Sequence, residues 1–153
     1  MVMLRRIWWA PREIFWPVFC NLWSACDATW WHQELLIFVL RRYAPAILSD
    51  DERKIFDALP ERVQVYRGCS RERIKGVSWT TERHIAEQFA RGHRMIRVPD
   101  PVIASAVIAK SDIFITNNDR DEHEVLLDPD HLQELSVEDW ATQAKAALAA
   151  LVS

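Results

Sequence analysis

Two glutamates separated by one residue, Glu122 and Glu124, are the side chains of this sequence best suited to chemistry. They open the stretch Glu-His-Glu-Val-Leu-Leu, which predicts a strand that ends at Leu127. Because side chains alternate along a strand, a spacing of two places both carboxylates on one face. Paired carboxylates can stabilise a forming cation and deprotonate a nucleophile, as they do in glycosidases. The same spacing is common as solvated charge on an exposed strand, so the pair gains meaning only from other residues.

Two segments upstream combine a polar side chain with a strand-like pattern. The stretch from Val63 to Gly68 predicts a strand with Arg67 near its end, and a second strand after Gly76 carries Ser78 and Thr80. A guanidinium can bind two phosphate oxygens at once, and a glycine leaves its backbone open to a ligand. Taken singly, Arg67 is equally well a surface arginine, and Ser-Trp-Thr-Thr is better explained as a strand end with a helix cap.

In chain order these residues are arginine, serine and paired glutamates. This order resembles the R-S-E class of mono-ADP-ribosyltransferases of the E-x-E type, including small prophage-associated and bacterial toxin members, over roughly Val63 to Pro129. The resemblance implies that NAD+ is a co-substrate and that no metal takes part. ADP-ribose would pass to an acceptor macromolecule, expected to be a protein with arginine favoured, while a nucleic-acid acceptor stays open. Only ten residues separate Arg67 from Ser78, so the helix that well-known toxins carry there must be reduced or missing.

The resemblance also implies a role for each matched residue. Glu124 would bond the ribose 2'-hydroxyl and stabilise the cation, Glu122 would orient or deprotonate the nucleophile, and Ser78 would position the catalytic glutamate. Arg67 would hold NAD+ through a phosphate and brace the site. The backbone of Gly68 would approach the nicotinamide amide.

Three weaker candidates for contact with NAD+ come from the same resemblance. Thr80 keeps the third hydroxyl of the family's S-T-S motif, while Trp79 replaces the middle threonine. Phe89 lies where the family often places an aromatic ring against nicotinamide, and Arg91 is a candidate phosphate contact. Phe89 also has helical spacing from Ile85, and core packing is the preferred interpretation.

Composition limits the architecture. A chain of 153 residues, half of them hydrophobic, has room for one core. The predicted fold is α+β, and the resemblance implies an ADP-ribosyltransferase-like core of two packed, mainly antiparallel sheets with helices at 62–153. A helical N-terminal region precedes it at 1–61, with a capping box predicted at Ser49 and Glu52. A further helix is expected from Ser136 to the C-terminus.

The net charge of -3 gives no indication of a general nucleic-acid or membrane-surface binder. Its distribution is uneven, because residues 62–97 hold nine Lys/Arg against three Glu, and residues 99–139 hold two against eleven Asp/Glu. The two halves would suit a cleft that holds a pyrophosphate at one end and a forming cation at the other. Equally, the two runs pair with each other or are solvated.

Six of the eight tryptophans lie in the first 31 residues, and Trp9, Trp16, Trp23 and Trp30 are spaced by sevens. Pro17 predicts a break there, with a helix from about Val18 to Trp31. Burial is favoured for these tryptophans over a surface for a helper or inhibitor protein. An odd number of cysteines without a CxxC favours a reducing compartment, the cytoplasm or a host cytoplasm after delivery. No signal peptide or membrane span is expected.

Two other functions remain open from the sequence. An NAD+ glycohydrolase toxin would use the same residues with water as the acceptor. A catalytically silent domain of the same fold would bind a partner through the aromatic N-terminus, although such a domain has no need to retain the full ordered set.

Overall fold

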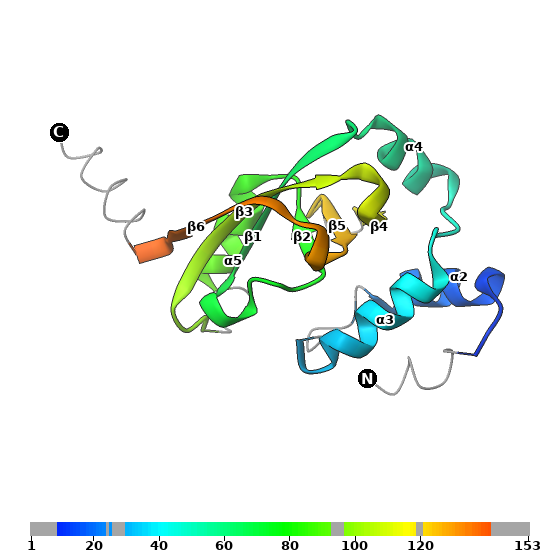
Figure 1. Ribbon diagram of the computed structural model, residues 1–153, viewed down its shortest axis with the longest axis horizontal. Coiled ribbons are helices and arrows are strands. Elements are labelled where there is room, and N and C mark those ends of the chain that lie inside the picture. The colour runs from blue at the N-terminus through cyan, green and yellow to red at the C-terminus, as the bar shows by residue number, and fades with distance from the viewer. Residues whose placement is uncertain (1–8, 24, 26–29, 93–96, 119–120, 142–153) are drawn as a thin grey trace.

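The computed structural model describes residues 9–23, 25, 30–92, 97–118 and 121–141, and Figure 1 shows their arrangement. The helices are α2 (Arg12–Trp23), α3 (Gln33–Tyr43), α4 (Asp50–Ala58) and α5 (Arg83–Arg91). The strands are β1 (Arg62–Ser70), β2 (Ser78–Thr80), β3 (Pro101–Ala109), β4 (Ile113–Asn117), β5 (Glu124–Leu127) and β6 (Gln133–Asp139). The fold is therefore α+β, as the sequence predicts.

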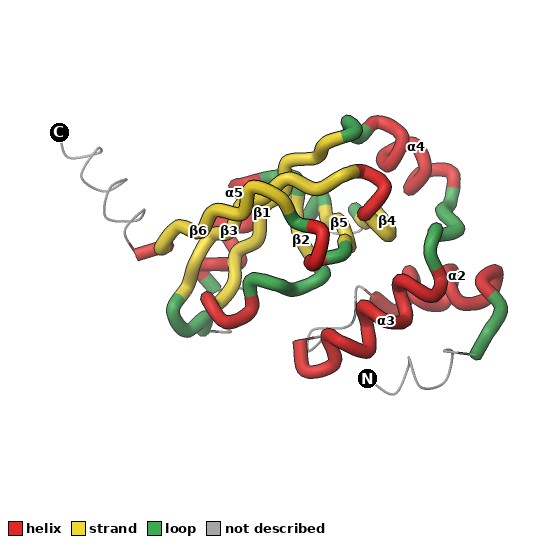
Figure 2. The backbone as a smooth tube through the Cα atoms, viewed as in Figure 1, coloured by secondary structure: helices red, strands yellow, loops and turns green. Residues whose placement is uncertain are grey.

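The described strands form one six-stranded sheet in the order β4-β5-β2-β1-β3-β6, and every neighbouring pair is antiparallel (Figure 2). The expectation of two packed sheets was wrong for this part of the chain. The short strand β2 is the reason, because it pairs with β5 on one side and with β1 on the other. Its link to β1 is the single pair Tyr66↔Thr80, so two half-sheets meet at a narrow seam.

The two faces of the sheet pack against different parts of the chain. The register places Tyr66, Thr80 and Glu124 on one face, because directly paired residues point the same way. On that face Tyr66 packs with α5, and Leu126 packs with α2 and α3. The opposite face carries Trp79 with apolar residues of β1, β3 and β5, and α4 contributes Phe56; the strand residues are Val63, Val65, Ala104, Ala106, Ile108, Val125 and Leu127.

The N-terminal helices share a hydrophobic core with the sheet. Apolar side chains of α2 and α3 pack in one cluster with Phe114 and Ile115 of β4 and Leu126 of β5. The ranges 1–61 and 62–153 are thus joined by a common core in the described residues. Part of the tryptophan pattern is explained by this packing: Trp16 and Trp23 are 0 % and 5 % exposed, whereas Trp9 and Trp31 are 71 % and 76 % exposed.

The helix around Pro17 differs from the prediction, because α2 begins at Arg12, runs through the proline and ends at Trp23. A proline inside a helix costs about 3 kcal/mol. Burying one large apolar side chain contributes roughly 1.5–3 kcal/mol. Four of them are buried on α2, so tertiary packing outweighs the local cost; they are Phe15, Trp16, Phe19 and Trp23.

The C-terminal end of the described chain also differs. Ser136 to Asp139 was expected to begin a helix, but these residues lie in β6 and pair with β3 from Ser105 to Val102. The free edge of β3 offers hydrogen bonds that a sequence pattern does not reveal. The remainder of that expected helix, at 142–153, lies outside the described residues. The capping box at Ser49 and Glu52 is confirmed at the start of α4.

Among the described residues, none of the helices has both the length and the apolar character needed to cross a membrane.

Candidate functional site

The carboxylate of Glu124 accepts three side-chain hydrogen bonds. Ser78 Oγ donates to Oε1 at 2.5 Å. Trp23 Nε1 donates to Oε2 at 3.0 Å, and Asn117 Nδ2 donates to the same oxygen at 3.2 Å. The three donors come from β2, α2 and β4, so distant parts of the chain meet at one carboxylate.

Strand register explains two of these contacts. Asn117 and Glu124 are direct partners in the pairing of β4 with β5. Ser78 pairs with Leu126, which makes it the diagonal neighbour of Glu124 on the same face. Direct and diagonal neighbours lie within reach of long side chains, and the glutamate side chain spans the diagonal. The sheet therefore fixes Ser78 and Asn117 around the carboxylate.

The ionisation of Glu124 reflects opposing effects. Burial raises the pKa of its carboxyl above the ordinary value for glutamate. The hydrogen bonds oppose this rise because they stabilise the ionised form, and the negative charge of Glu122 adds to the rise. A carboxylate with a raised pKa beside a cavity is a common feature of functional sites.

A cavity of about 300 Å³ lies on the side of the carboxylate where Trp23 and Asn117 stand. Its remaining lining comes from α2, α4 and β4, namely Cys20, Asn21, Glu52 and Ile115. None of these lining residues is cationic. The cavity therefore suits a neutral or positively charged planar group better than a phosphate.

Glu122 does not lie on the strand face where the sequence placed it. β5 begins at Glu124, and His123 has a left-handed backbone with φ 46°. This conformation interrupts the alternation that would align the two glutamates. The carbonyl of Glu122 instead accepts a hydrogen bond of 2.8 Å from Thr80 Oγ1. Glu122 thus stands at the end of a loop, close enough to Glu124 to raise its pKa.

The hydroxyl of Thr80 connects two segments of the chain through hydrogen bonds. Its hydroxyl donates to the Glu122 carbonyl and accepts a hydrogen bond of 3.1 Å from the backbone N–H of Glu82. The side chain is buried, 5 % exposed, so both sides of the hydroxyl are used within the protein. Thr80 joins the start of α5 to the loop before β5, and its predicted contact with NAD+ remains a prediction.

Arg67 lies on the opposite face of the sheet from Ser78 and Glu124, together with Val63 and Val65. Its guanidinium donates to the main-chain carbonyl of Ser78, and its Nε donates to the Arg73 carbonyl at 3.0 Å. The structure therefore brings Arg67 to the backbone of the serine strand and not to the glutamate side chain. A bracing role is compatible with this geometry.

Gly68 is required by the packing of α5. A Cβ at this position would lie 1.7 Å from the carbonyl oxygen of Ala86, so only glycine lets the helix approach β1 this closely. The same glycine was expected to leave space for nicotinamide, but α5 fills the space that a Cβ would occupy. Its lack of a side chain thus serves the helix–strand contact.

Phe89 and Arg91 lie on α5, the helix that packs against Tyr66 of β1. Phe89 is half-buried, while the fully buried residues of its helix are Ile85, Ala86 and Ala90. The guanidinium of Arg91 lies over the Trp140 ring, 5.7 Å from its centroid.

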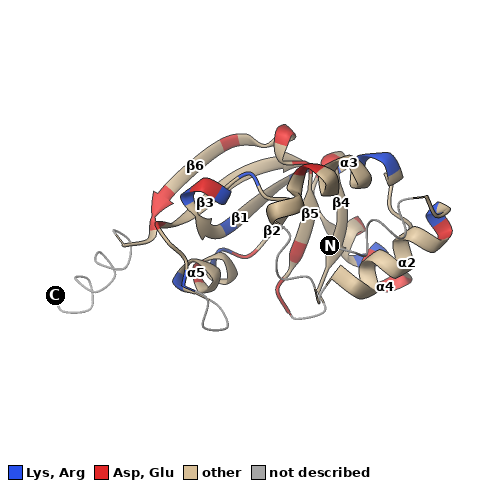
Figure 3. Cartoon of the chain, turned by 90° about the horizontal axis from the view of Figure 1, so that it is seen from below, with Lys and Arg blue, Asp and Glu red and all other residues tan. Residues whose placement is uncertain are grey.

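Three arginines of the basic run pair with carboxylates of the acidic run. Arg62 pairs with Glu134 of β6, Arg71 with Asp100 and Asp139, and Arg83 with Glu87 and Glu138. Figure 3 accordingly shows acidic and basic residues interspersed, not divided between two ends. The simple pairing of the two runs, one of the two sequence interpretations, accounts for these arginines.

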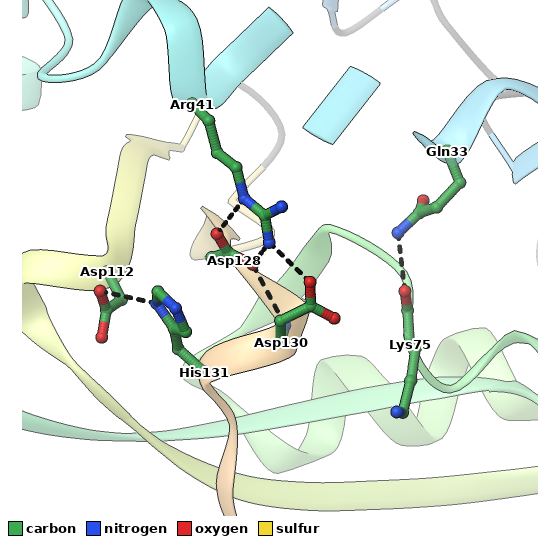
Figure 4. Close-up of polar contacts among 7 residues, drawn as sticks. All are labelled: Gln33, Arg41, Lys75, Asp112, Asp128, Asp130 and His131. Atoms are coloured by element: carbon green, nitrogen blue, oxygen red, sulfur yellow. Dashed lines mark hydrogen bonds and ion pairs between the residues drawn. The ribbon is translucent and has the colours of Figure 1, made fainter. Parts of the chain in front are cut away.

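Polar contacts tie α3 to the sheet beside the site (Figure 4). Arg41 donates to both oxygens of Asp128, at 2.7 and 2.8 Å, and to Asp130 at 2.6 Å. Gln33 donates to the Lys75 carbonyl at 2.6 Å, at the other end of the same helix. Both ends of α3 are thereby held against the loops that flank β2 and β5.

Sequence reasoning missed Trp23 and Asn117. The tryptophan spacing marked Trp23 as a helix-face residue but carried no sign of its polar partner, 101 residues away. Asn117 follows the apolar run from Ile113 to Ile115 and is the last residue of β4. An extension of that apolar run by two residues would have placed Asn117 beside the glutamate strand.

Among the described residues, no group of three or more His, Cys, Asp or Glu side chains is arranged to hold a metal ion. Comparison of the chain with protein-family models, with curated proteins and with solved structures found no match.

Proposed function

We propose that this protein is a mono-ADP-ribosyltransferase that cleaves NAD+ and transfers ADP-ribose to an acceptor protein, with arginine as the favoured residue. An effector of phage or toxin type is the setting that best suits such an activity. The observation that carries the proposal is the half-buried Glu124 carboxylate, which accepts hydrogen bonds from Ser78 and from two residues that line the cavity, Trp23 and Asn117. The order of Arg67, Ser78, Glu122 and Glu124 along the chain supports the same function.

The chemistry requires a carboxylate beside the ribose. When the bond between ribose C1' and the nicotinamide nitrogen breaks, nicotinamide leaves with the bonding electron pair and C1' acquires oxocarbenium character. Glu124 would accept a hydrogen bond from the 2'-hydroxyl and stabilise this positive charge. The acceptor nitrogen then bonds to C1' and loses a proton, which Glu122 would take up.

The cavity next to Glu124 supports one orientation of the substrate. At about 300 Å³ it lies at the lower end of ligand-site volumes, so it suits one part of a dinucleotide. The nicotinamide ring of NAD+ is planar and cationic, and the cavity offers an indole, two amides and a carboxylate. The pyrophosphate would lie outside it, because none of its described lining residues is cationic.

One observation favours a second function, an NAD+ glycohydrolase. Glu122 lies before β5 and not on its face, so its alignment with an incoming acceptor is less constrained than in a regular strand. With water as the nucleophile, the same carboxylate at Glu124 would suffice.

The test is the release of nicotinamide from NAD+ by purified protein, with and without cell lysate as a source of acceptors. The wild type is expected to release nicotinamide, and Glu124→Gln is expected to lose about 10²–10³-fold in rate. Labelled product in the lysate would identify a transferase, and free ADP-ribose alone would identify a hydrolase. Equal release by wild type and Glu124→Gln would refute the assignment of this carboxylate.

A further inference from the structure

We propose that Trp23 is a positioning residue for the Glu124 carboxylate, so that helix α2 supplies part of the site and is more than a cover for the sheet. The consequence for activity rests on the function proposed above. The hydrogen bond from Trp23 to Glu124 does not depend on that function, and it can be measured in protein without substrate.

The hydrogen bond from Trp23 differs from those of two other buried indoles, Trp16 and Trp79. Trp16 donates to the main-chain carbonyl of Tyr43 at 3.0 Å, and Trp79 donates to that of Gly76 at 2.8 Å. Those two bonds satisfy a buried indole N–H within the fold, as buried tryptophans generally require. Trp23 donates instead to a carboxylate, and a hydrogen bond to a charged group is stronger than one to a neutral group.

The three donors restrict which oxygen of Glu124 can meet a ligand. Each carboxylate oxygen has about two acceptor positions. Trp23 and Asn117 occupy those of Oε2, and Ser78 occupies one on Oε1. A further donor, such as a sugar hydroxyl, is therefore directed to Oε1. Without the indole N–H, Oε2 regains an acceptor position and the carboxylate can rotate.

The position of the indole is itself set by packing. Trp23 is 5 % exposed and stacks on Phe19, with ring centroids 5.4 Å apart and planes at 24°. Both rings belong to the cluster that α2 and α3 share with β4 and β5. Arg41 fixes α3 to Asp128 at the end of β5, close in sequence to Glu124. The donor is thus held at the carboxylate by the core and not by the hydrogen bond alone.

Few charged groups face Glu124 from the elements around it. Glu122 approaches from the preceding loop, and Glu52 of α4 lines the adjoining cavity. The side chains that β2, β4 and α2 direct at the carboxylate are neutral, namely those of Ser78, Asn117 and Trp23. A change in the titration of Glu124 after removal of the indole N–H therefore reports that hydrogen bond.

The test compares Trp23→Phe with Trp16→Phe, a matched variant that removes an indole N–H from the same helix but from a bond to a carbonyl. The titration of Glu124 is followed by carbon NMR of the side-chain carboxyl, with Glu124→Gln to assign the resonance. Trp23→Phe is expected to raise the pKa of Glu124 above that of wild type, because a donor to the ionised form is lost. Trp16→Phe is expected to leave that pKa unchanged.

Activity provides the second readout. Trp23→Phe is expected to lower kcat/KM for NAD+ cleavage about tenfold, mainly through kcat, as the loss of one hydrogen bond to a charged group implies. Trp16→Phe is expected to retain wild-type kinetics at an equal folded fraction. If Trp23→Phe unfolds, 3-benzothienylalanine at position 23 keeps the ring shape without the N–H and takes its place.

The outcomes separate this inference from the proposed function. An unchanged Glu124 titration in the Trp23 variant overturns the positioning role, whatever the activity. Faster turnover in that variant also overturns it, because the indole would then obstruct the carboxylate. A shifted titration in a protein that does not cleave NAD+ would retain the positioning role and reject only the function.

Discussion

Nη1 of Arg67 donates a hydrogen bond to the main-chain carbonyl of Ser78, although the two side chains lie on opposite faces of the sheet. Nε of the same guanidinium donates to the Arg73 carbonyl, and a Cβ on Gly76 would collide with the guanidinium at 2.3 Å. β1 and β2 share only the pair Tyr66↔Thr80. The Arg67 side chain therefore adds a hydrogen bond between β1 and β2, two neighbouring strands that share a single residue pair.

Arg67→Lys is expected to lower the free energy of unfolding by about 1–3 kcal/mol, because lysine cannot reproduce two hydrogen bonds to separate carbonyls. NAD+ cleavage is expected to fall at least about tenfold, since Ser78 would lose the support of its backbone. Urea unfolding and nicotinamide release measure the two effects. Arg71→Lys is the control, because Arg71 is exposed and forms only surface ion pairs.

Glu122→Gln is expected to separate the two steps of the reaction. Transfer to an arginine acceptor should be lost, because the amide cannot take up a proton, while NAD+ cleavage should persist at a reduced rate. Mass spectrometry of a protein acceptor and nicotinamide release from the same reaction measure both. Transfer at the wild-type rate would show that Glu122 does not handle the nucleophile.

Glu124 is expected to make stability fall as pH rises. Burial raises its pKa in the folded state above that in the unfolded state, so the folded protein holds the proton more tightly between the two values. The destabilising effect is absent below the unfolded pKa and complete above the folded pKa. Urea unfolding of wild type and Glu124→Gln across this pH range tests the effect. The titration of the other carboxylates contributes equally to both proteins and cancels in the difference between their free energies of unfolding. Parallel pH profiles would contradict a raised pKa.

Arg41→Ala is expected to lower the free energy of unfolding by about 1–2 kcal/mol, because Asp128 is 4 % exposed and would lose its cation. Burial alone would raise the pKa of Asp128, but the hydrogen bonds from Arg41 hold it below the ordinary value. The stabilisation is therefore present above the unfolded pKa and lost as pH falls through the folded pKa. Thermal unfolding at neutral and acidic pH measures both effects.

The control for the pairing of Arg41 with Asp128 is Arg42→Ala, because Arg42 is an exposed neighbour on the same helix. Its unfolding curve is expected to match that of wild type at each pH. If Arg42→Ala lowers the free energy of unfolding as much as Arg41→Ala does, the effect comes from the charge on α3 and not from the pairing with Asp128.

Local patterns predicted most elements of this fold. The capping box at Ser49, the alternation through Val63 and Val65, and the helix that places Ile85 inward all appear where the sequence indicates them. Each of these signals lies within a few residues of the structure that it forms. The misjudged elements, α2 through Pro17 and β6, depend instead on partners elsewhere in the chain.

The candidate site could also be predicted only in part from the sequence. Ser78 and Glu124 were both singled out, and the structure brings their side chains together. Trp23 could not be found, because nothing near it in sequence shows that its indole meets a carboxylate. The misplacement of Glu122 has a local cause, since the left-handed backbone of His123 has no clear sequence signal in a non-glycine residue.

The shared core also has a consequence for the order in which the chain is made. α2 and α3 emerge from the ribosome before β4 and β5, so part of their apolar surface is not yet packed against Phe114, Ile115 and Leu126. Trp23 and Glu124 are 101 residues apart, so synthesis at about 5–20 residues per second leaves this surface uncovered for several seconds. The nascent helices α2 and α3 are therefore natural clients for chaperones, and the site is completed only after β5 has been translated.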